Sequence, residues 1–161
     1  MNVKFDGNPI TLVGECVNVG DNAPDFLVVD NGLNNVKLSN TSGKRIFLAI
    51  PSIDTPVCDM EVRKFNEEAA KLKNVTVYVV SMDLPFAQSR WCGNAGVENV
   101  KIVSDYKHKS FGNNYGTLVE ELGLLSRAVF VVDENNKIKY VEYCEDIVNE
   151  PNYEKALEAV K

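Results

Sequence analysis

The sequence predicts an α/β fold, with one domain spanning residues 1–161 and a central mixed sheet flanked by helices. Three observations predict this fold class. A length of 161 residues suits one domain with a buried core. Continuous apolar runs, typical of strands covered on both faces, occur at Ile46–Ile50, Val75–Val80 and Ala128–Asp133. Segments with helical spacing lie between such runs, and helices that connect buried strands imply parallel neighbours in a sheet.

The N-terminal part predicts two β-hairpins. The first covers roughly Val3–Val17, with Gly7-Asn8-Pro9 as its turn. The second joins Asp25–Asp30 to Val36–Leu38 through Asn31-Gly32, a dipeptide typical of tight turns. We therefore expect an extra β-hairpin at the N-terminus, ahead of the central sheet.

The middle of the chain alternates predicted strands and helices. Apolar residues at helical spacing predict a helix from Cys58 to about Leu72. A shorter helix opens at Leu84-Pro85, because proline is tolerated in a first turn, and we expect Gly93 to end it. Val100–Val103 is the next strand. This strand–helix–strand–helix–strand order is typical of an α/β sheet.

The last part of the chain predicts two strands and a helix. Glu134–Asn136 turns the Ala128–Asp133 strand into Ile138–Cys144, and Tyr153–Val160 forms the terminal helix. Before them, Phe111–Gly116 is expected to be a loop. A sheet that closes in this order is similar to the thioredoxin-like fold, an analogy that by itself says little about chemistry.

Charge and hydropathy exclude several classes of function. The net charge is −6 at pH 7, whereas a nucleic-acid partner would require a basic face. No apolar run approaches the length of a membrane span, and the N-terminus lacks the apolar core of a secretory signal. We therefore expect a cytoplasmic protein, in a compartment that keeps thiols reduced.

The cysteines and the single histidine limit the chemistry further. None of Cys16, Cys58, Cys92 and Cys144 belongs to a C-x-x-C pair, and His108 has no metal-ligand spacing to a cysteine. The pattern argues against a structural zinc site. Cys16 and Cys144 belong to no motif, so we interpret them as small buried hydrophobic residues, with a sensor role for Cys144 as the alternative.

The loop Pro51–Cys58 carries the strongest signal for chemistry. It follows a buried strand and ends where a helix is predicted to begin. A cysteine there meets unpaired backbone N–H groups and the positive end of the helix dipole, which favour the nucleophilic thiolate. Thr55 could reach a bound oxygen, and Arg127 could offset the acidic neighbours of the loop. On the residues alone, an inert buried thiol at Cys58 and a solvated arginine at Arg127 stay open.

Two motifs add a family resemblance. Pro51-x-x-x-Thr55-x-x-Cys58 resembles the active-site pattern of peroxiredoxins. Phe86–Cys92, which ends in Arg-Trp-Cys, is similar to the resolving-cysteine helix of the bacterial thiol peroxidases, the atypical 2-Cys peroxiredoxins. The similarity covers essentially the whole chain, including the N-terminal hairpin and Ser126-Arg127. It implies a thioredoxin-like fold and an antioxidant peroxidase that uses thiols only, with no cofactor and no metal.

The resemblance also implies a role for each residue of the site. Cys58 would be the peroxidatic cysteine, whose thiolate attacks the peroxide and becomes a sulfenic acid. Thr55 and Arg127 would hold the peroxide, aided by the backbone N–H groups of Val57 and Cys58. Pro51 would shield the sulfur from water.

The second half of the implied reaction depends on Cys92. It would resolve the sulfenic acid into an intramolecular Cys58–Cys92 disulfide, which thioredoxin would reduce by exchange. Hydrogen peroxide and organic hydroperoxides would be the substrates, and the protein would be a homodimer. Two alternatives stay open. The first is a redox sensor, and the second is a general thiol–disulfide oxidoreductase, which the wide spacing of the two cysteines disfavours.

Overall fold

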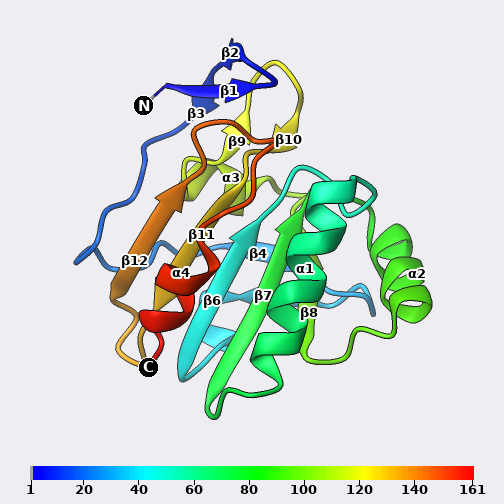
Figure 1. The fold of residues 1–161 in the computed structure, drawn as a ribbon, viewed down its shortest axis with the longest axis vertical. Coiled ribbons are helices and arrows are strands. Elements are labelled where there is room, and N and C mark those ends of the chain that lie inside the picture. The colour runs from blue at the N-terminus through cyan, green and yellow to red at the C-terminus, as the bar shows by residue number, and fades with distance from the viewer. Residues whose placement is uncertain (1) are drawn as a thin grey trace.

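A seven-stranded mixed sheet forms the centre of the molecule, in the order β12-β11-β6-β7-β8-β4-β5 (Figure 1). The computed structural model describes residues 2–161. The parallel centre consists of β6 (Lys44–Ala49), β7 (Val75–Ser81) and β8 (Val100–Ser104). On one side β11 (Ala128–Val132) pairs antiparallel with β6, and β12 (Ile138–Tyr143) pairs antiparallel with β11. The predicted mixed sheet is confirmed.

The other side of the sheet ends in the predicted second hairpin. β4 (Leu27–Val29) and β5 (Asn35–Lys37) are antiparallel, and a short 3₁₀ helix, η1 (Leu38–Asn40), follows them. β4 pairs with β8 only through Val29 and Ser104, so the two strands diverge along the rest of β8. This divergence leaves space beside β8.

Helices cover both faces of the sheet. In Figure 1, α1 (Pro56–Ala69) and α4 (Tyr153–Glu158) lie in front of it, α2 (Pro85–Ala95) lies beside β8, and α3 (Ser110–Asn114) lies behind. Side chains of β6 alternate between two apolar clusters, because successive side chains of a strand point to opposite faces. Ile46 and Leu48 join the cluster under α1, whereas Phe47 joins the aromatic cluster around α3.

Within residues 2–161, two small sheets lie outside the central one, and the N-terminal hairpin forms the first of them. β1 (Val3–Phe5) and β2 (Asn8–Ile10) form the predicted hairpin, but its turn is Asp6-Gly7, so Asn8 and Pro9 already belong to β2. The remaining predicted part, β3 (Leu12–Val13), leaves the hairpin to pair with β9 (Leu118–Val119), which also pairs with β10 (Leu124–Leu125).

The structure corrects the predicted helix boundaries. α1 begins at Pro56 rather than Cys58, because proline suits a first helical position whose N–H needs no partner. α2 continues through Gly93 and ends at Ala95, and its C-cap Gly96 adopts the left-handed conformation at φ 66°. The expected loop at residues 111–116 contains most of α3, where the Phe111 and Tyr115 rings stack at 4.2 Å between centroids.

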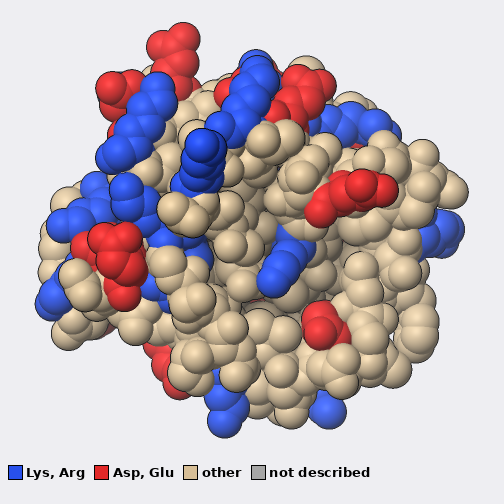
Figure 2. Space-filling view, turned by 90° about the horizontal axis from the view of Figure 1, so that it is seen from below, with Lys and Arg blue, Asp and Glu red and all other residues tan. Residues whose placement is uncertain are grey.

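The two ends of the parallel strands carry different parts of the molecule. Figure 2 shows the end at which β6 and β7 begin, where acidic and basic side chains are intermixed with uncharged surface. The loop that carries Cys58 lies at the opposite end, after β6. This is the end of a parallel sheet at which α/β proteins hold their ligands.

Candidate active site

Cys58 is the third residue of α1 and is fully buried. Thr55 is the N-cap, and its carbonyl accepts the first helical hydrogen bond, which Asp59 N–H donates at 2.9 Å. The N–H groups of Val57 and Cys58 precede that bond and belong to the unpaired first turn of the helix. The Cys58 sulfur therefore lies where backbone donors and the helix dipole favour negative charge.

Asp83 holds the loop that leads into the helix. One of its carboxylate oxygens accepts a hydrogen bond from Ser52 Oγ at 2.8 Å, and the other accepts one from Ile53 N–H at 2.8 Å. Ser81 Oγ donates to the same carboxylate at 2.6 Å. The carboxylate after β7 therefore fixes the geometry of the Cys58 loop, a role that no local pattern around Asp83 indicated.

Arg127 lies directly against the Cys58 sulfur. Its Nη2 donates to Cys58 Sγ at 3.1 Å, and only 2% of its surface is exposed. Nη1 donates to Glu61 Oε2 at 2.5 Å, and Nε donates to the carbonyl of Ile147 at 2.9 Å. The interpretation of Arg127 as a solvated arginine is therefore wrong. The antiparallel pairing of β11 with β6 brings it here, across 69 positions of sequence.

Glu61 completes a buried charge network that the sequence did not reveal. It lies one turn after Cys58 on α1 and is fully buried, and its Oε1 has no partner among the described residues. Burial raises the pKa of Glu61 to about 7, although the neighbouring Arg127 acts to lower it. The pKa of Arg127 is raised, because attraction to Glu61 and Cys58 outweighs the desolvation that lowers it. The network therefore holds a guanidinium charge between a carboxyl group and a sulfur.

A cavity of about 210 Å³ opens beside this network. The predicted site residues Pro51, Thr55, Val57 and Arg127 line it. The Thr55 hydroxyl donates to the carbonyl of Ser52 at 3.0 Å, which leaves its oxygen lone pairs for another donor. The remaining wall is mostly apolar and is formed by side chains from three other segments: Phe5, Leu124, Ile147 and Val148.

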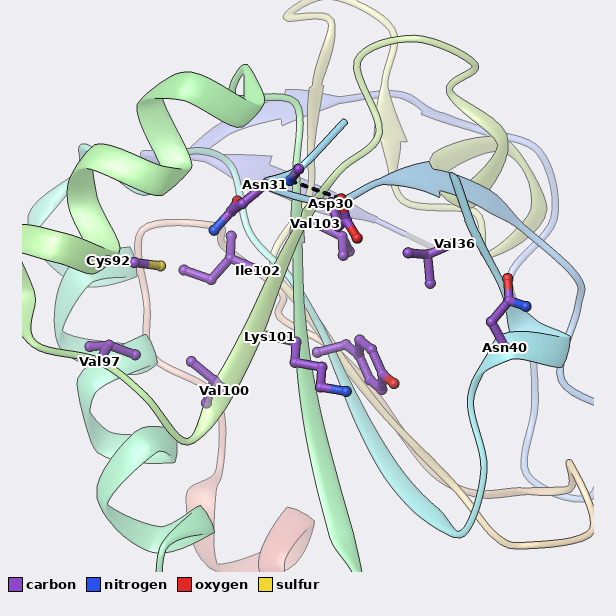
Figure 3. A pocket seen from close by; sticks show the side chains of 12 residues that line it. Asp30, Asn31, Val36, Asn40, Cys92, Val97, Val100, Lys101, Ile102 and Val103 are labelled. Atoms are coloured by element: carbon purple, nitrogen blue, oxygen red, sulfur yellow. Dashed lines mark hydrogen bonds between the residues drawn. The ribbon is translucent and has the colours of Figure 1, made fainter. Parts of the chain in front are cut away.

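The structure does not place Cys92 in this cavity. Cys92 lies near the end of α2, is half-buried, and points into a second cavity of about 470 Å³ (Figure 3). That cavity occupies the space where β4 and β8 diverge. Desolvation raises the pKa of Cys92, although a hydrogen bond from Asn31 acts to lower it. The residues that line the two cavities share no member, and all four cysteines are free thiols.

The two remaining cysteines lie outside both cavities. Cys144 is buried, as the packing interpretation predicts, and burial together with Glu142 and Glu61 raises its pKa to about 12. Cys16 is half-buried beside Tyr143. Across residues 2–161, no cluster of His, Cys, Asp and Glu side chains has the arrangement of a metal site. Over the same range, no helix has the length and apolar character needed to span a membrane.

Comparisons with known proteins show the family to which the chain belongs. Residues 18–157 match the protein family described as Redoxin. The chain belongs to the Redoxin family. Family relatives include the thiol peroxidase of Clostridium acetobutylicum, 53% identical over 161 residues, which are all of this chain and 98% of the relative. The thiol peroxidase of Bacillus subtilis is 54% identical over 160 residues, 99% of this chain and 96% of the relative.

A solved structure of the family shows the same architecture. A peroxiredoxin-like protein from Aquifex aeolicus superposes with a TM-score of 0.93 at 40% identity, covering 99% of this chain and 95% of that protein. The comparisons confirm the resemblance to bacterial thiol peroxidases and the thioredoxin-like fold with its N-terminal hairpin.

Proposed function

We propose that this protein is a peroxidase that reduces hydrogen peroxide and organic hydroperoxides with the thiolate of Cys58. The observation that carries the proposal is the 3.1 Å hydrogen bond from the buried Arg127 guanidinium to Cys58 Sγ at the start of α1. A buried positive charge that touches a sulfur at a helix N-terminus favours ionisation of that sulfur. The thiol peroxidase relatives support the same activity.

The first step consumes the peroxide. The Cys58 thiolate attacks the terminal oxygen of the hydroperoxide, the S–O bond forms, and the O–O bond breaks. Sulfur is oxidised to the sulfenic acid, and the other oxygen leaves as an alkoxide or hydroxide that takes up a proton. Arg127, the Thr55 hydroxyl and the N–H groups of Val57 and Cys58 stabilise the charge that develops on the two oxygens. Pro51 shields the sulfur from water.

The second step forms a disulfide. The Cys92 thiolate attacks the sulfur of the sulfenic acid, the Cys58–Cys92 bond forms, and the S–O bond breaks to release hydroxide, which takes up a proton and leaves as water. A disulfide requires Cα atoms within about 4.4–6.8 Å. Cys92 lines a cavity that shares no lining residue with the one beside the fully buried Cys58. We therefore expect α2 around Cys92, or the first turn of α1, to unwind. Gly93 inside α2 lowers the cost, since glycine stabilises a helix poorly. Superimposable backbones in the reduced and disulfide forms would rule out this movement.

The third step restores the thiols. A dithiol reductant attacks the disulfide, and thioredoxin is the proposed partner, consistent with the partly exposed position of Cys92. The homodimer is a proposal that depends on the family resemblance alone, and the cytoplasmic location is a proposal that depends on the sequence properties described above. Light scattering of the purified protein tests the oligomeric state.

A coupled assay tests the function against its alternatives. Wild-type protein with thioredoxin, thioredoxin reductase and NADPH should oxidise NADPH only when hydrogen peroxide or cumene hydroperoxide is added. Reduction of insulin without turnover of peroxide would instead indicate a general thiol–disulfide oxidoreductase. Oxidation by one equivalent of peroxide, with no turnover in the presence of reductant, would indicate a redox sensor.

A further inference from the structure

The N-terminal hairpin forms one wall of the cavity beside Cys58. Phe5, the last residue of β1, lines this cavity together with Val148, which follows β12. Both side chains remain more than a third exposed in this structure, at 39% and 38%. The peroxidase steps proposed above assign a role to neither of them.

The carboxylate of Asp146 fastens the hairpin in place. One oxygen accepts the N–H of Asp6 at 2.9 Å, and the other accepts the N–H of Gly7 at 2.8 Å. Asp6 and Gly7 form the turn of the hairpin and have φ of 49° and 81°. Successive residues in this left-handed conformation can direct their N–H groups at one anion, and here the anion is a side chain of the chain itself.

Backbone hydrogen bonds extend the attachment to the residues before the turn. The N–H of Lys4 donates to the carbonyl of Glu145 at 2.8 Å, and the N–H of Ile147 donates to the carbonyl of Lys4 at 3.0 Å. Phe5 therefore lies between a backbone attachment at Lys4 and a carboxylate attachment at Asp6. The position of Phe5 over the cavity is therefore set by residues 145–148.

The same segment also holds the catalytic arginine. The carbonyl of Ile147 accepts the hydrogen bond from Arg127 Nε at 2.9 Å. Residues 145–147 are thus hydrogen-bonded both to the hairpin that carries Phe5 and to Arg127, whose guanidinium contacts Cys58 Sγ. The apolar wall and the charged end of the cavity are therefore fixed relative to each other.

We propose that Phe5 is a specificity-determining residue that contacts the apolar tail of an organic hydroperoxide, and that Asp146 is the residue that positions it. The proposal depends on the peroxidase activity proposed above. The cavity of about 210 Å³ is smaller than pockets that enclose drug-sized ligands, so it fits a compact tail such as a cumyl group. Hydrogen peroxide has no tail and gains nothing from Phe5.

The ratio of kcat/KM for cumene hydroperoxide to kcat/KM for hydrogen peroxide tests the role of Phe5. Phe5→Ala should lower this ratio about tenfold, mainly through a higher KM for cumene hydroperoxide, as expected for a lost apolar contact. The value for hydrogen peroxide should change less than about twofold. Phe5→Leu, which keeps an apolar side chain, should restore most of the ratio.

Asp146→Ala tests the attachment and has a matched control. It should lower the same ratio about threefold, because Phe5 stays present but loses its fixed position. Glu145→Ala removes the same charge from the neighbouring residue and keeps the backbone bond to Lys4, so its ratio should equal that of the wild type. Thermal unfolding of each variant confirms that it is folded.

The outcomes separate this inference from the proposed function. An unchanged ratio in folded Phe5→Ala, or an equal loss for both peroxides, overturns the role of Phe5 while the peroxidase activity stands. A ratio in Asp146→Ala that matches Glu145→Ala overturns the positioning role. Wild-type protein that consumes neither peroxide overturns the proposed function itself.

Discussion

The surroundings of Cys58 and Cys92 differ in almost every physical respect. Cys58 is fully buried at the first turn of a helix, and a guanidinium donates a hydrogen bond to its sulfur. Cys92 is partly exposed near the end of another helix and points into an open cavity, where desolvation raises its pKa. Positive charge and helix donors favour a thiolate at the first position, whereas the second lies near the end of its helix, away from the first-turn donors.

The comparison teaches that burial alone does not decide whether a thiol reacts. Cys144 is buried nearly as fully as Cys58, and desolvation, followed by the charges of Glu142 and Glu61, raises its pKa to about 12, although Arg127 acts to lower it. Cys58 touches the positive charge instead. A direct hydrogen bond from a positive charge therefore separates the proposed nucleophile from a core thiol that burial and acidic neighbours keep protonated.

The largest expected effect comes from replacing the sulfur of Cys58. Cys58→Ser should reduce turnover of peroxide by more than about a thousandfold, because a serine hydroxyl does not ionise near neutral pH. The coupled NADPH assay measures this loss. Cys144→Ser is the matched control and should keep wild-type activity. Comparable activity in Cys58→Ser and wild type would contradict the assignment of the nucleophile.

Cys92→Ser should separate the two halves of the reaction. We expect steady-state turnover with thioredoxin to stop, while the first equivalent of peroxide is consumed at the wild-type rate, because Cys92 does not line the cavity beside Cys58. Rapid-mixing measurements of the first turnover check this result. A first turnover slowed as much as the steady state would show that Cys92 acts before the sulfenic acid forms.

Removal of the positive charge sharpens the comparison. Arg127→Ala should lower kcat/KM for hydrogen peroxide about a hundredfold, the usual order for loss of a donor to developing charge. Arg127→Lys keeps the positive charge but loses the planar set of guanidinium N–H donors, and it should recover part of the rate. Arg63→Ala removes an exposed arginine from α1, the helix that carries Cys58, and should change little. Equal rates in Arg127→Ala and Arg63→Ala would remove Arg127 from the mechanism.

The smallest expected effect concerns the pH dependence of stability. The pKa of Glu61 is raised from 4.5 to about 7 on folding, so the folded protein binds more protons than the unfolded chain between these values. Its contribution to the free energy of unfolding should therefore fall as pH rises through this window, by up to about 3 kcal/mol. Glu61→Gln should remove this decline, whereas Glu67→Gln, an exposed change on the same helix, should keep it. The free energy of unfolding is measured with urea at several pH values. An equal decline with pH in wild type and Glu61→Gln would contradict the prediction.

Local patterns predicted the parts of the molecule that depend on neighbouring residues. The buried strands, the helix that begins at the Cys58 loop and the second hairpin were predicted from apolar spacing and turn residues. Cys58 and Thr55 were candidates because loop, helix start and sulfur lie within one short motif, although an inert Cys58 stayed open until the family resemblance was added. Arg127 required the family resemblance, since spacing alone favoured a solvated position.

The missed features depend on contacts between distant segments. Asp83 and Glu61 look like ordinary surface acids in sequence, and only the packing of α1 and β7 places them at the site. α3 was missed because its support comes from the Asp105 carboxylate, which accepts the N–H groups of Phe111 and Gly112. The contact of the N-terminal hairpin with residues 145–148 spans nearly the whole chain, so no window of sequence contains it.

The most direct test asks which sulfur the peroxide oxidises first. Cys92→Ser protein is mixed with one equivalent of hydrogen peroxide in the presence of dimedone, a trap for sulfenic acids, and the labelled cysteine is located by mass spectrometry. We predict one label per chain, on Cys58, with Cys16 and Cys144 unlabelled. A label on either of those cysteines instead, or an unlabelled Cys58 after the peroxide has been consumed, would contradict the account.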